Sequence, residues 1–321
     1  MERYLTIQVI QNENSDPTGL TVEQIMRKQA GLTKRQISRA KFCSDGILKN
    51  GIQCRVTEMV FPGDMICVCV EEKSETSAHL EGMAAELNIL YEDEDLLVVN
   101  KPAGLVTHPQ GVHYDDTLAN RAVAYFRGKG EEHAIRPIGR LDKDTSGIVV
   151  FAKNKLAASR LQKQREQKLF QKTYLAVVCG ELPADGLTHR IEEAIGPDPH
   201  DRLKMQITPD GKHAVTYYRV LERRKDRSLV SLILDTGRTH QIRVHMAGIG
   251  HPLCGDPLYG EICEKKSRCS DEKTTSRARL HAWKVKLVQP LTGEVLEFEA
   301  GMPEDYFFDD VAEGLKCASP S

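Results

Sequence analysis

Apolar and polar residues alternate in short blocks along most of the chain, and these blocks predict more strands than helices. From Leu87 to about Phe307, β-like runs surround one convincing helix, Lys155–Phe170, which lacks Gly and Pro. No strand–helix–strand rhythm of about 30 residues is present, so the pattern favours an α+β domain with a mixed, largely antiparallel sheet. The expected strands are Leu96–Val99, Gly147–Ala152, Tyr174–Cys179, Thr216–Val220, Leu229–Leu234 and Trp283–Val288.

A different pattern, two helices followed by a hairpin, occupies Leu20–Val70. Two Thr-x-x-Gln spacings of the capping-box type predict where the helices begin, and Gly31 closes the first helix. Asn50-Gly51 between apolar residues predicts the hairpin, and a Pro-Gly-Asp turn leads into a strand at Met65–Val70. The capping pairs are Thr21 with Gln24 and Thr33 with Gln36.

These patterns divide the chain into two domains, which also suits its length of 321 residues. We expect a small helix-helix-hairpin domain at 18–71, a polar linker at 72–86, a larger domain at 87–308 and a tail at 309–321. A charged surface insertion is expected at 261–277, inside the larger domain.

Composition narrows the class of protein. The longest apolar runs are about six residues, far short of the ~20 that a membrane helix needs, and the first residues show no secretory signal. Nine cysteines without a CxxC pair fit free thiols in a reducing cytoplasm. We therefore expect a cytoplasmic protein without a membrane partner.

Charge changes the picture further, because it is unevenly distributed. With 44 basic and 46 acidic residues the net charge is −2, which by itself argues against a nucleic-acid partner. Between Arg27 and Lys41, however, stand six basic residues and no acid. Such a run is either a solvated helix face or a phosphate-binding surface, and the absence of interleaved acids favours the second. The candidate RNA-binding residues there are Lys34, Arg35, Arg39 and Lys41.

Local signatures for several enzyme classes are missing. The chain has no GxxxxGK[ST], GxGxxG, HExxH or GxSxG motif, and no zinc deaminase pattern. The histidine pairs His108/His113 and His240/His245 are each five residues apart, which does not place them on one helix face, and no acidic or cysteine ligands accompany them. We therefore expect no metal site.

Three polar, glycine-containing loops follow or precede expected strands and could converge on one cleft. They are the loop after Leu96–Asn100, the loop in PIGRLDKDTSGIVVFAK at 137–153, and LDTGRTHQIRVHMAGIGHPLCGDPLYG at 234–260. The second loop alone allows either an active site or a turn in which Asp and Ser cap backbone groups.

Together these stretches resemble the pseudouridine synthases of the RluA type. NKPAG, RLDKDTSG, KTYLAVV, GRTHQIRVHMA with GHPLCGDPLYG, and LHAW with PLTGE occur in the family's order. The segment KRQISRAKFCSDGILKNGIQCRVTEMVFPGDMICVCV resembles the small RNA-binding domain named after a ribosomal protein of the small subunit. The two resemblances imply an isomerase that converts uridine to pseudouridine in RNA, with large-subunit ribosomal RNA the expected target and transfer RNA an alternative.

The family resemblance also implies roles for single residues. Asp142 matches the catalytic aspartate, Arg243 the arginine that pairs with it, and Tyr174 the active-site tyrosine. The remaining substrate-binding candidates are Arg140, Ile242, Lys101 and His240. Uracil leaves as a delocalised anion, so the second carboxylate of a glycosidase is less necessary. The aspartate either attacks the sugar or removes a sugar proton, and no cofactor is required.

The sequence departs from the family at one position and leaves two other hypotheses open. Gly139 stands where the usual motif has histidine before Arg-Leu-Asp, so any contact that this histidine makes with the target nucleotide is lost here. A catalytically silent RNA-binding or assembly factor on the same scaffold is the main alternative. A metal-dependent nuclease using Asp142 and Asp144 is disfavoured, because no third carboxylate lies close to them in the sequence. We expect a monomer.

Overall fold

The computed structural model describes residues 4–10, 20–70, 80, 82–109, 115–260, 277–303 and 305. The expected domain boundaries near 18, 71 and 308, most of the linker, nearly all of the insertion and the tail lie outside these residues. No helix in the described part of the chain is long and apolar enough to cross a membrane.

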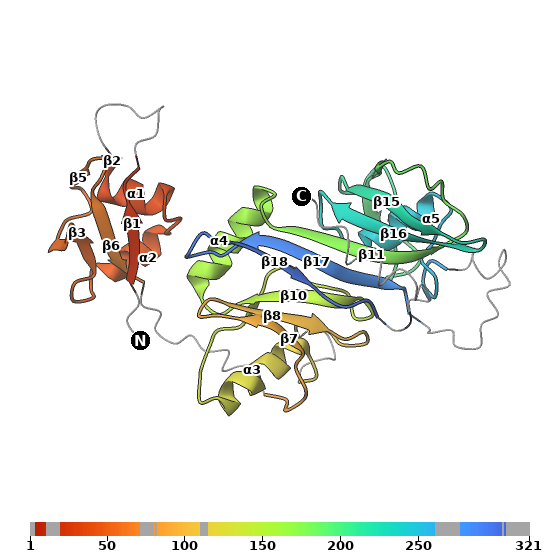
Figure 1. Cartoon of the computed structure of the whole chain (residues 1–321), viewed down its shortest axis with the longest axis horizontal. Helices are drawn as coiled ribbons and strands as arrows, with labels where there is room; N and C mark the ends of the chain where they lie inside the picture. The colour runs from red at the N-terminus through yellow and green to blue at the C-terminus, as the bar shows by residue number, and fades with distance from the viewer. Residues whose placement is uncertain are drawn as a thin grey trace.

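The N-terminal unit contains two short helices, α1 (Val22–Lys28) and α2 (Lys34–Ala40), beside a four-stranded sheet (Figure 1). Both helices begin at the predicted threonines with complete capping boxes, and Gly31 adopts φ +68° after α1. One buried apolar cluster joins the helices to the sheet. The strands of the unit are β1 (Tyr4–Gln8), β2 (Leu20–Thr21), β3 (Ile47–Lys49), β4 (Ile52–Gln53), β5 (Met59–Val60) and β6 (Met65–Cys69).

The large domain is built on a ten-stranded sheet, whose main path in the described residues is β12-β15-β16-β11-β17-β10-β8-β7. Only β10 and β17 pair in parallel there, and the other neighbours are antiparallel. The prediction of a mixed, largely antiparallel sheet is therefore confirmed. The strands are β7 (Ile89–Glu92), β8 (Leu96–Lys101), β9 (Arg136–Pro137), β10 (Ser146–Ala152), β11 (Gln171–Cys179), β12 (His189–Glu192), β15 (Val215–Arg223), β16 (Arg227–Leu234), β17 (Leu280–Val288) and β18 (Val295–Glu299), with a separate pair β13 (Ile195–Pro197) and β14 (Met205–Ile207).

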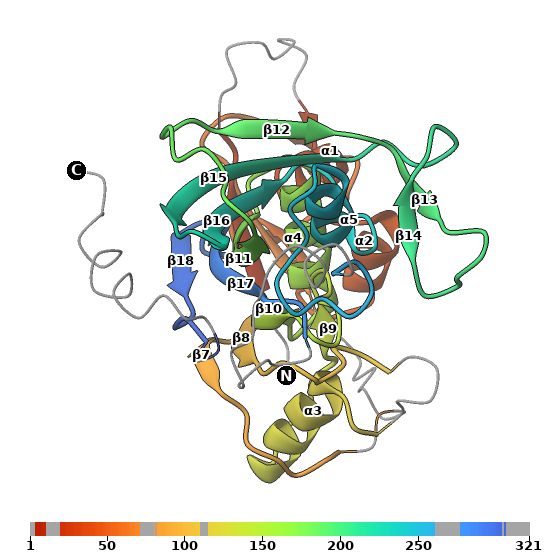
Figure 2. The ribbon, with the colours of Figure 1, turned by 90° about the vertical axis from the view of Figure 1, so that its right-hand side faces the viewer.

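Among the described residues three helices, not one, pack on this sheet: α3 (Leu118–Gly128), α4 (Lys155–Glu166) and α5 (Gln241–Gly248). Alternate residues of β8 and β10 enter two different apolar clusters, one with α3 and one with α4, so these helices cover opposite faces. Figure 2 shows α5 beside β15 and β16, where its apolar residues join a third cluster. The prediction of a single helix was wrong: α5 is short and lies in a stretch predicted as a loop, and α3 was overlooked although its sequence, LANRAVAYFRG, is largely apolar and contains no Pro.

Helix α4 also ends earlier than predicted, at Glu166 instead of Phe170. Lys168 adopts φ +59°, a left-handed conformation that stops a helix. The chain then turns directly into β11. The last turn of α4 therefore lies beside the loop before β10 and the loop before α5.

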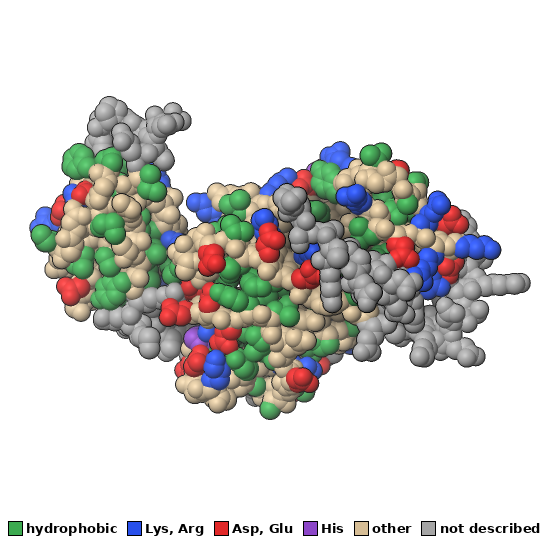
Figure 3. All heavy atoms as spheres, in the orientation of Figure 1, with side chains coloured by type: hydrophobic (Ala, Val, Ile, Leu, Met, Phe, Trp, Pro, Cys, Tyr) green, Lys and Arg blue, Asp and Glu red, His purple; other side chains and the backbone are tan. Residues whose placement is uncertain are grey.

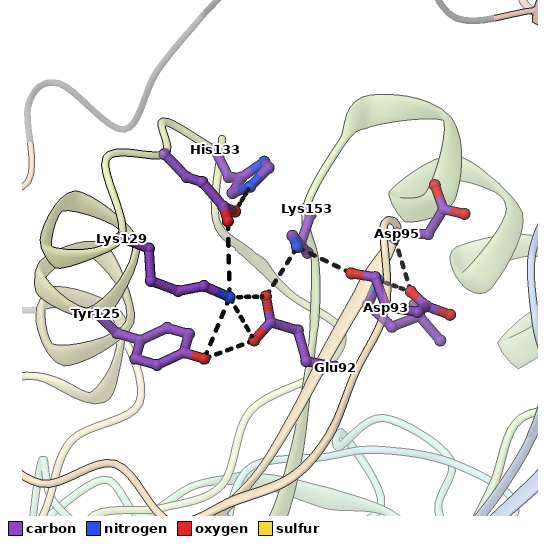
Figure 4. A network of polar contacts seen from close by, with 9 residues as sticks. Glu92, Asp93, Asp95, Tyr125, Lys129, His133 and Lys153 are labelled. Atoms are coloured by element: carbon purple, nitrogen blue, oxygen red, sulfur yellow. Dashed lines mark hydrogen bonds and ion pairs between the residues drawn. The ribbon is translucent and has the colours of Figure 1, made fainter.

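A polar network fixes the start of α4 and holds α3 against the sheet (Figure 4). Glu92 accepts hydrogen bonds from Tyr125 at 2.7 Å, Lys153 at 3.1 Å and Lys129 at 3.2 Å. Next to it, Asn154 donates to Asp95 at 2.7 Å and its side-chain oxygen caps α4. Because carboxylates accept the side-chain hydrogen bonds of this network, and such charge-assisted bonds are strong, the network gives α4 a defined position relative to the sheet.

The same helix contacts the N-terminal unit (Figure 1). Arg160 donates to the carbonyl of Ala30, just after α1, at 2.6 and 2.8 Å, and also to the carbonyl of Pro290. Leu156 is part of the apolar cluster of the N-terminal unit. Helix α4 thus packs against both the N-terminal unit and the sheet of the large domain.

Candidate active site

A cleft of about 880 Å³ lies between the loop before β10, the end of α4, the start of β11 and the loop before α5. The second and third loops singled out from the sequence therefore meet at one place. The lining includes Arg140, Asp142, Tyr174, His240, Ile242 and Arg243, which are six of the seven expected catalytic and substrate-binding residues.

Asp142 lies in a loop that is anchored on both sides. The buried hydroxyl of Thr107 donates to the carbonyl of Leu141 at 2.9 Å, and the amide of Thr145 donates to the carbonyl of Asp142 at 3.2 Å. The carboxylate is 28% exposed, and Nε2 of His240 lies 4.0 Å from one of its oxygens. The backbone is thus fixed while the carboxylate stays accessible from the cleft.

Lys101 lies beneath this loop and not in the lining of the cleft. Its fully buried ammonium group donates to the carbonyls of Pro102, Leu105 and Lys143 at 2.7 to 3.0 Å. Burial lowers its pKa to about 7, against the opposing charges of Asp144 and Asp142. The geometry makes Lys101 an anchor of the loop, since its hydrogens already have protein acceptors.

Arg243 on α5 reaches the cleft, but its direct partner is Asp256. Two hydrogen bonds of 2.7 and 2.6 Å join the guanidinium to this carboxylate, which is 0% exposed. Burial lowers the pKa of Arg243, yet its bonds and attraction to Asp256 outweigh this and leave the pKa raised. Asp142 acts on Arg243 at longer range. Sequence reasoning missed Asp256, although it stands inside the quoted GHPLCGDPLYG stretch.

Tyr174 enters the cleft from β11, at an irregularity in the pairing with β17. It contacts two apolar clusters and so lies between the two halves of the sheet. Burial, together with the charge of Asp142, raises its pKa to about 12, while Arg165 opposes this. The phenol is therefore neutral at pH 7.

The start of α5 places His240 and Ile242. His240 is the N-cap residue in a left-handed conformation, φ 55°, and its Nδ1 lies 3.0 Å from the hydroxyl of Tyr259. Burial lowers the pKa of His240, so the ring favours its neutral form. Ile242 is 3% exposed and supplies apolar surface to the wall.

The other expected residues lie at the rim or elsewhere. Arg140 is exposed beside Asp142 and lines the cleft. The four cations of the N-terminal unit are exposed on and just after α2 and do not line the cleft; they are Lys34, Arg35, Arg39 and Lys41. Within the described residues no group of three or more His, Cys, Asp or Glu side chains is placed to hold a metal ion.

Comparisons with known proteins agree on one family. The family model described as RNA pseudouridylate synthase matches residues 95–248. The chain is 42% identical over 271 residues to an uncharacterized RNA pseudouridine synthase, YlyB, of Bacillus subtilis, covering 83% of this chain and 85% of that protein. It is 37% identical over 310 residues to ribosomal large subunit pseudouridine synthase D of Neisseria meningitidis serogroup B, covering 92% of this chain and 82% of that protein.

A solved structure supports the same fold. Human RNA pseudouridylate synthase domain containing 1 matches with a TM-score of 0.55 and 28% sequence identity. The match covers 75% of this chain and 98% of the human chain.

Proposed function

Because this chain belongs to the RNA pseudouridylate synthase family and is an isomerase of RNA uridines, we propose that Asp142 is its catalytic carboxylate and that large-subunit ribosomal RNA is its substrate. One observation supports the site above all others: Asp142 is an accessible carboxylate on a rigidly anchored loop, inside a cleft that also contains Tyr174 and Arg243. The cleft is roomy enough for an extruded nucleotide.

Asp142 acts at the sugar of the target uridine. The reaction breaks the bond between the uracil nitrogen and the ribose, turns the base and rejoins it through carbon 5. An ionised carboxylate beside the anomeric carbon stabilises or attacks the cationic sugar that develops, or removes the neighbouring sugar proton. Arg243, held in place by Asp256, supplies a positive charge on the same side of the cleft as the carboxylate of Asp142, and the two charges attract each other.

Tyr174 and Ile242 hold the base. The Tyr174 ring stacks on uracil, and Ile242 adds an apolar contact. The family resemblance also implies that Tyr174 takes up the proton lost from carbon 5, but with a pKa of about 12 little of the phenolate that would act as this base is present at pH 7. Stacking is therefore the better-supported role. Arg140, exposed at the rim, enters the space that the uridine vacates.

The N-terminal unit binds RNA in the manner of the ribosomal-protein-type domain that its sequence resembles. Its capped helix α2 presents exposed cations and no acid between Lys34 and Lys41. The relative named for the ribosomal large subunit matches 92% of this chain, which supports the choice of ribosomal over transfer RNA. We place the enzyme in the cytoplasm as a monomer, without a cofactor.

Asp142→Asn tests the proposal. We expect it to abolish pseudouridine formation in large-subunit ribosomal RNA transcribed in vitro, while the affinity for RNA stays within a few-fold of wild type. Asp144→Asn is the matched control, because Asp144 lies two residues away and does not line the cleft. Product from the Asp142 variant at wild-type rate would overturn the assignment.

The two competing functions give different results. A silent RNA-binding factor would yield no pseudouridine from the wild-type protein either. A metal-dependent nuclease would cut the RNA and would lose activity in both aspartate variants. A silent factor would lack one of the three catalytic residues of the family. This chain has all of them, Asp142, Tyr174 and Arg243, in the lining of one cleft, which favours the isomerase.

A further inference from the structure

Arg165, in the last turn of α4, lies against two glycines of the cleft wall. A Cβ placed on Gly139 would be 3.7 Å from its Cζ, and one placed on Gly237 would be 3.8 Å from its Nη2. These glycines belong to the two loops that carry Asp142 and His240. The guanidinium therefore spans the gap between the two loops at the side of the cleft.

Most N–H donors of the Arg165 guanidinium have no acceptor among the described residues. Its one hydrogen bond among the described residues goes from Nη1 to Gln162 on its own helix, at 3.3 Å. Two other cations of the cleft have carboxylate partners: Lys168 pairs with Asp235 at 2.9 Å, and Arg243 pairs with Asp256. Arg165 has no such partner in the described part of the chain, and its side chain is exposed.

The positive charge of Arg165 acts on groups inside the cleft. Arg165 opposes the burial that raises the pKa of Tyr174, and together with burial it lowers the pKa of Lys172 to about 7. Both residues line the cleft. An anion at the mouth would therefore meet a positive field that extends from the exposed guanidinium inward.

Because Gly139 and Gly237 have no side chains, the backbone next to the Arg165 guanidinium is not covered. Gly139 adopts φ +75°, a conformation that side chains rarely permit, so no Cβ covers the loop there. A bulky ligand backbone can approach such a surface closely. A planar guanidinium in this setting matches the two oxygens of a phosphate group.

We propose that Arg165 binds a phosphate of the RNA backbone next to the target uridine and so positions that uridine over Asp142. The proposal rests on the proposed function. Arg165 is a positioning residue here, because it meets the backbone of the substrate and not the reacting atoms.

The alternative is that Arg165 only complements the dipole at the end of α4. Lys163 serves as a matched control for this role, since it is an exposed cation in the same last turn. It stands two residues from Arg165, so it projects from a different side of the helix, and it does not line the cleft. A dipole effect would be shared by both residues, whereas a phosphate contact belongs to Arg165.

The experiment compares Arg165→Ala, Arg165→Lys and Lys163→Ala with the wild type on large-subunit ribosomal RNA transcribed in vitro. We measure kcat and KM for pseudouridine formation, and separately the affinity for this RNA, between 50 and 200 mM salt. Losing one phosphate contact should reduce the slope of log affinity against log salt by about 0.7–0.9. We expect that change for Arg165→Ala, with KM raised about tenfold and kcat changed less.

The two other variants sharpen the result. Arg165→Lys should keep the salt slope and recover part of the lost KM, because it keeps the charge but not the two-pronged geometry. Lys163→Ala should match the wild type. An unchanged slope and KM in Arg165→Ala, or equal losses in Lys163→Ala, would overturn the inference. Absence of product from the wild type would instead refute the proposed function, and the binding slopes would still decide the role of Arg165.

Discussion

At the scale of single residues, the ion pair between Arg243 and Asp256 fixes a cation in the wall of the cleft. Asp256 has further bonds, because its Oδ1 also accepts the amide hydrogens of Leu258 and Tyr259. The ring of Tyr259 lies 5.0 Å from the guanidinium carbon. Arg243 therefore cannot turn toward Asp142 without leaving Asp256 unpaired in a buried place.

Asp256→Asn removes the charge from this pair and leaves the guanidinium without its counter-ion. Breaking a buried pair costs about 3–5 kcal/mol, so we expect a clearly lower unfolding midpoint in urea and a loss of pseudouridine formation. Asp235→Asn breaks the more exposed pair with Lys168 and should cost no more than about 1 kcal/mol. Equal stability of the two variants would contradict the role given to Asp256.

Lys101→Met tests the anchor beneath the catalytic loop through its pH dependence. The folded protein lowers the pKa of Lys101 to about 7 from 10.5, so between these values the unfolded chain holds more protons. The unfolding free energy should therefore rise with pH across that window. Lys101→Met should reduce this slope between pH 7.5 and 9.5 without removing it, because Lys172 has a similar shift.

Lys143→Met is the control for this titration, since Lys143 is an exposed lysine of the same loop. It should keep the wild-type slope. A Lys101 variant with the full slope would show that another group is responsible.

The sequence indicated which residues meet in the cleft better than it indicated what each one contacts. The family motifs identified Asp142, Tyr174 and Arg243, and the cleft brings all three together. The partner of Arg243 could not be predicted, because several acids stand within reach along the chain and only the fold selects Asp256. Lys101 ends a buried strand, and the pattern does not tell whether its side chain turns into the protein or into the cleft.

At the scale of elements, the sequence predicted correctly the helices whose starts are determined by neighbouring residues in the chain. The helices α1 and α2 begin with side chains that satisfy the first free amides, so their sequence spacing is sufficient to find them. Helix α5 begins at His240 in a left-handed conformation and has no side-chain cap, so its start depends on packing. Helix α3 does have a capping box with the same three-residue spacing, but its second member is Asn120 instead of the Gln that marked the N-terminal helices.

For the sheet, the sequence predicted the individual strands but not their order. Each of the six predicted strands of the large domain exists, because runs of apolar residues leave a strong pattern, most clearly in β8 and β10, which are buried on both faces. Their order could not be deduced, since it places β17 between β10 and β11 although it lies more than 100 residues further along the chain. That order brings the start of β11 beside the loop before β10 and so forms the cleft.

At the scale of the whole molecule, charge is arranged by region. On the face shown in Figure 3, blue and red side chains alternate at the end formed by β15 and β16, as expected of a solvated surface. Around α2, in contrast, six cations from Arg27 to Lys41 stand without an acid. The net charge of −2 is therefore a sum over unlike regions and does not describe the surface offered to RNA.

Charge reversal distinguishes these regions. The double variant Arg35→Glu with Arg39→Glu should weaken RNA binding and reduce its salt slope by roughly 0.7–0.9 for each lost contact. The control is Arg223→Glu with Arg224→Glu, a pair of exposed cations in the mixed region near Glu222 and Glu181. Electrophoretic mobility shifts at several salt concentrations measure both. The same salt slope for the two double variants would mean that α2 is only solvated.

Helix α4 gives the two parts of the protein a thermodynamic connection. Arg160 meets the N-terminal unit at Ala30, and five residues later Arg165 meets the loops of the cleft. Because this helix holds the two binding surfaces at a fixed separation, binding of an RNA at one surface raises its effective concentration at the other. Binding at the two places is then a linked equilibrium, and the coupling must be reciprocal. An RNA that engages both would bind with positive cooperativity, so the enzyme would discriminate against fragments that contain the target uridine but lack the second contact.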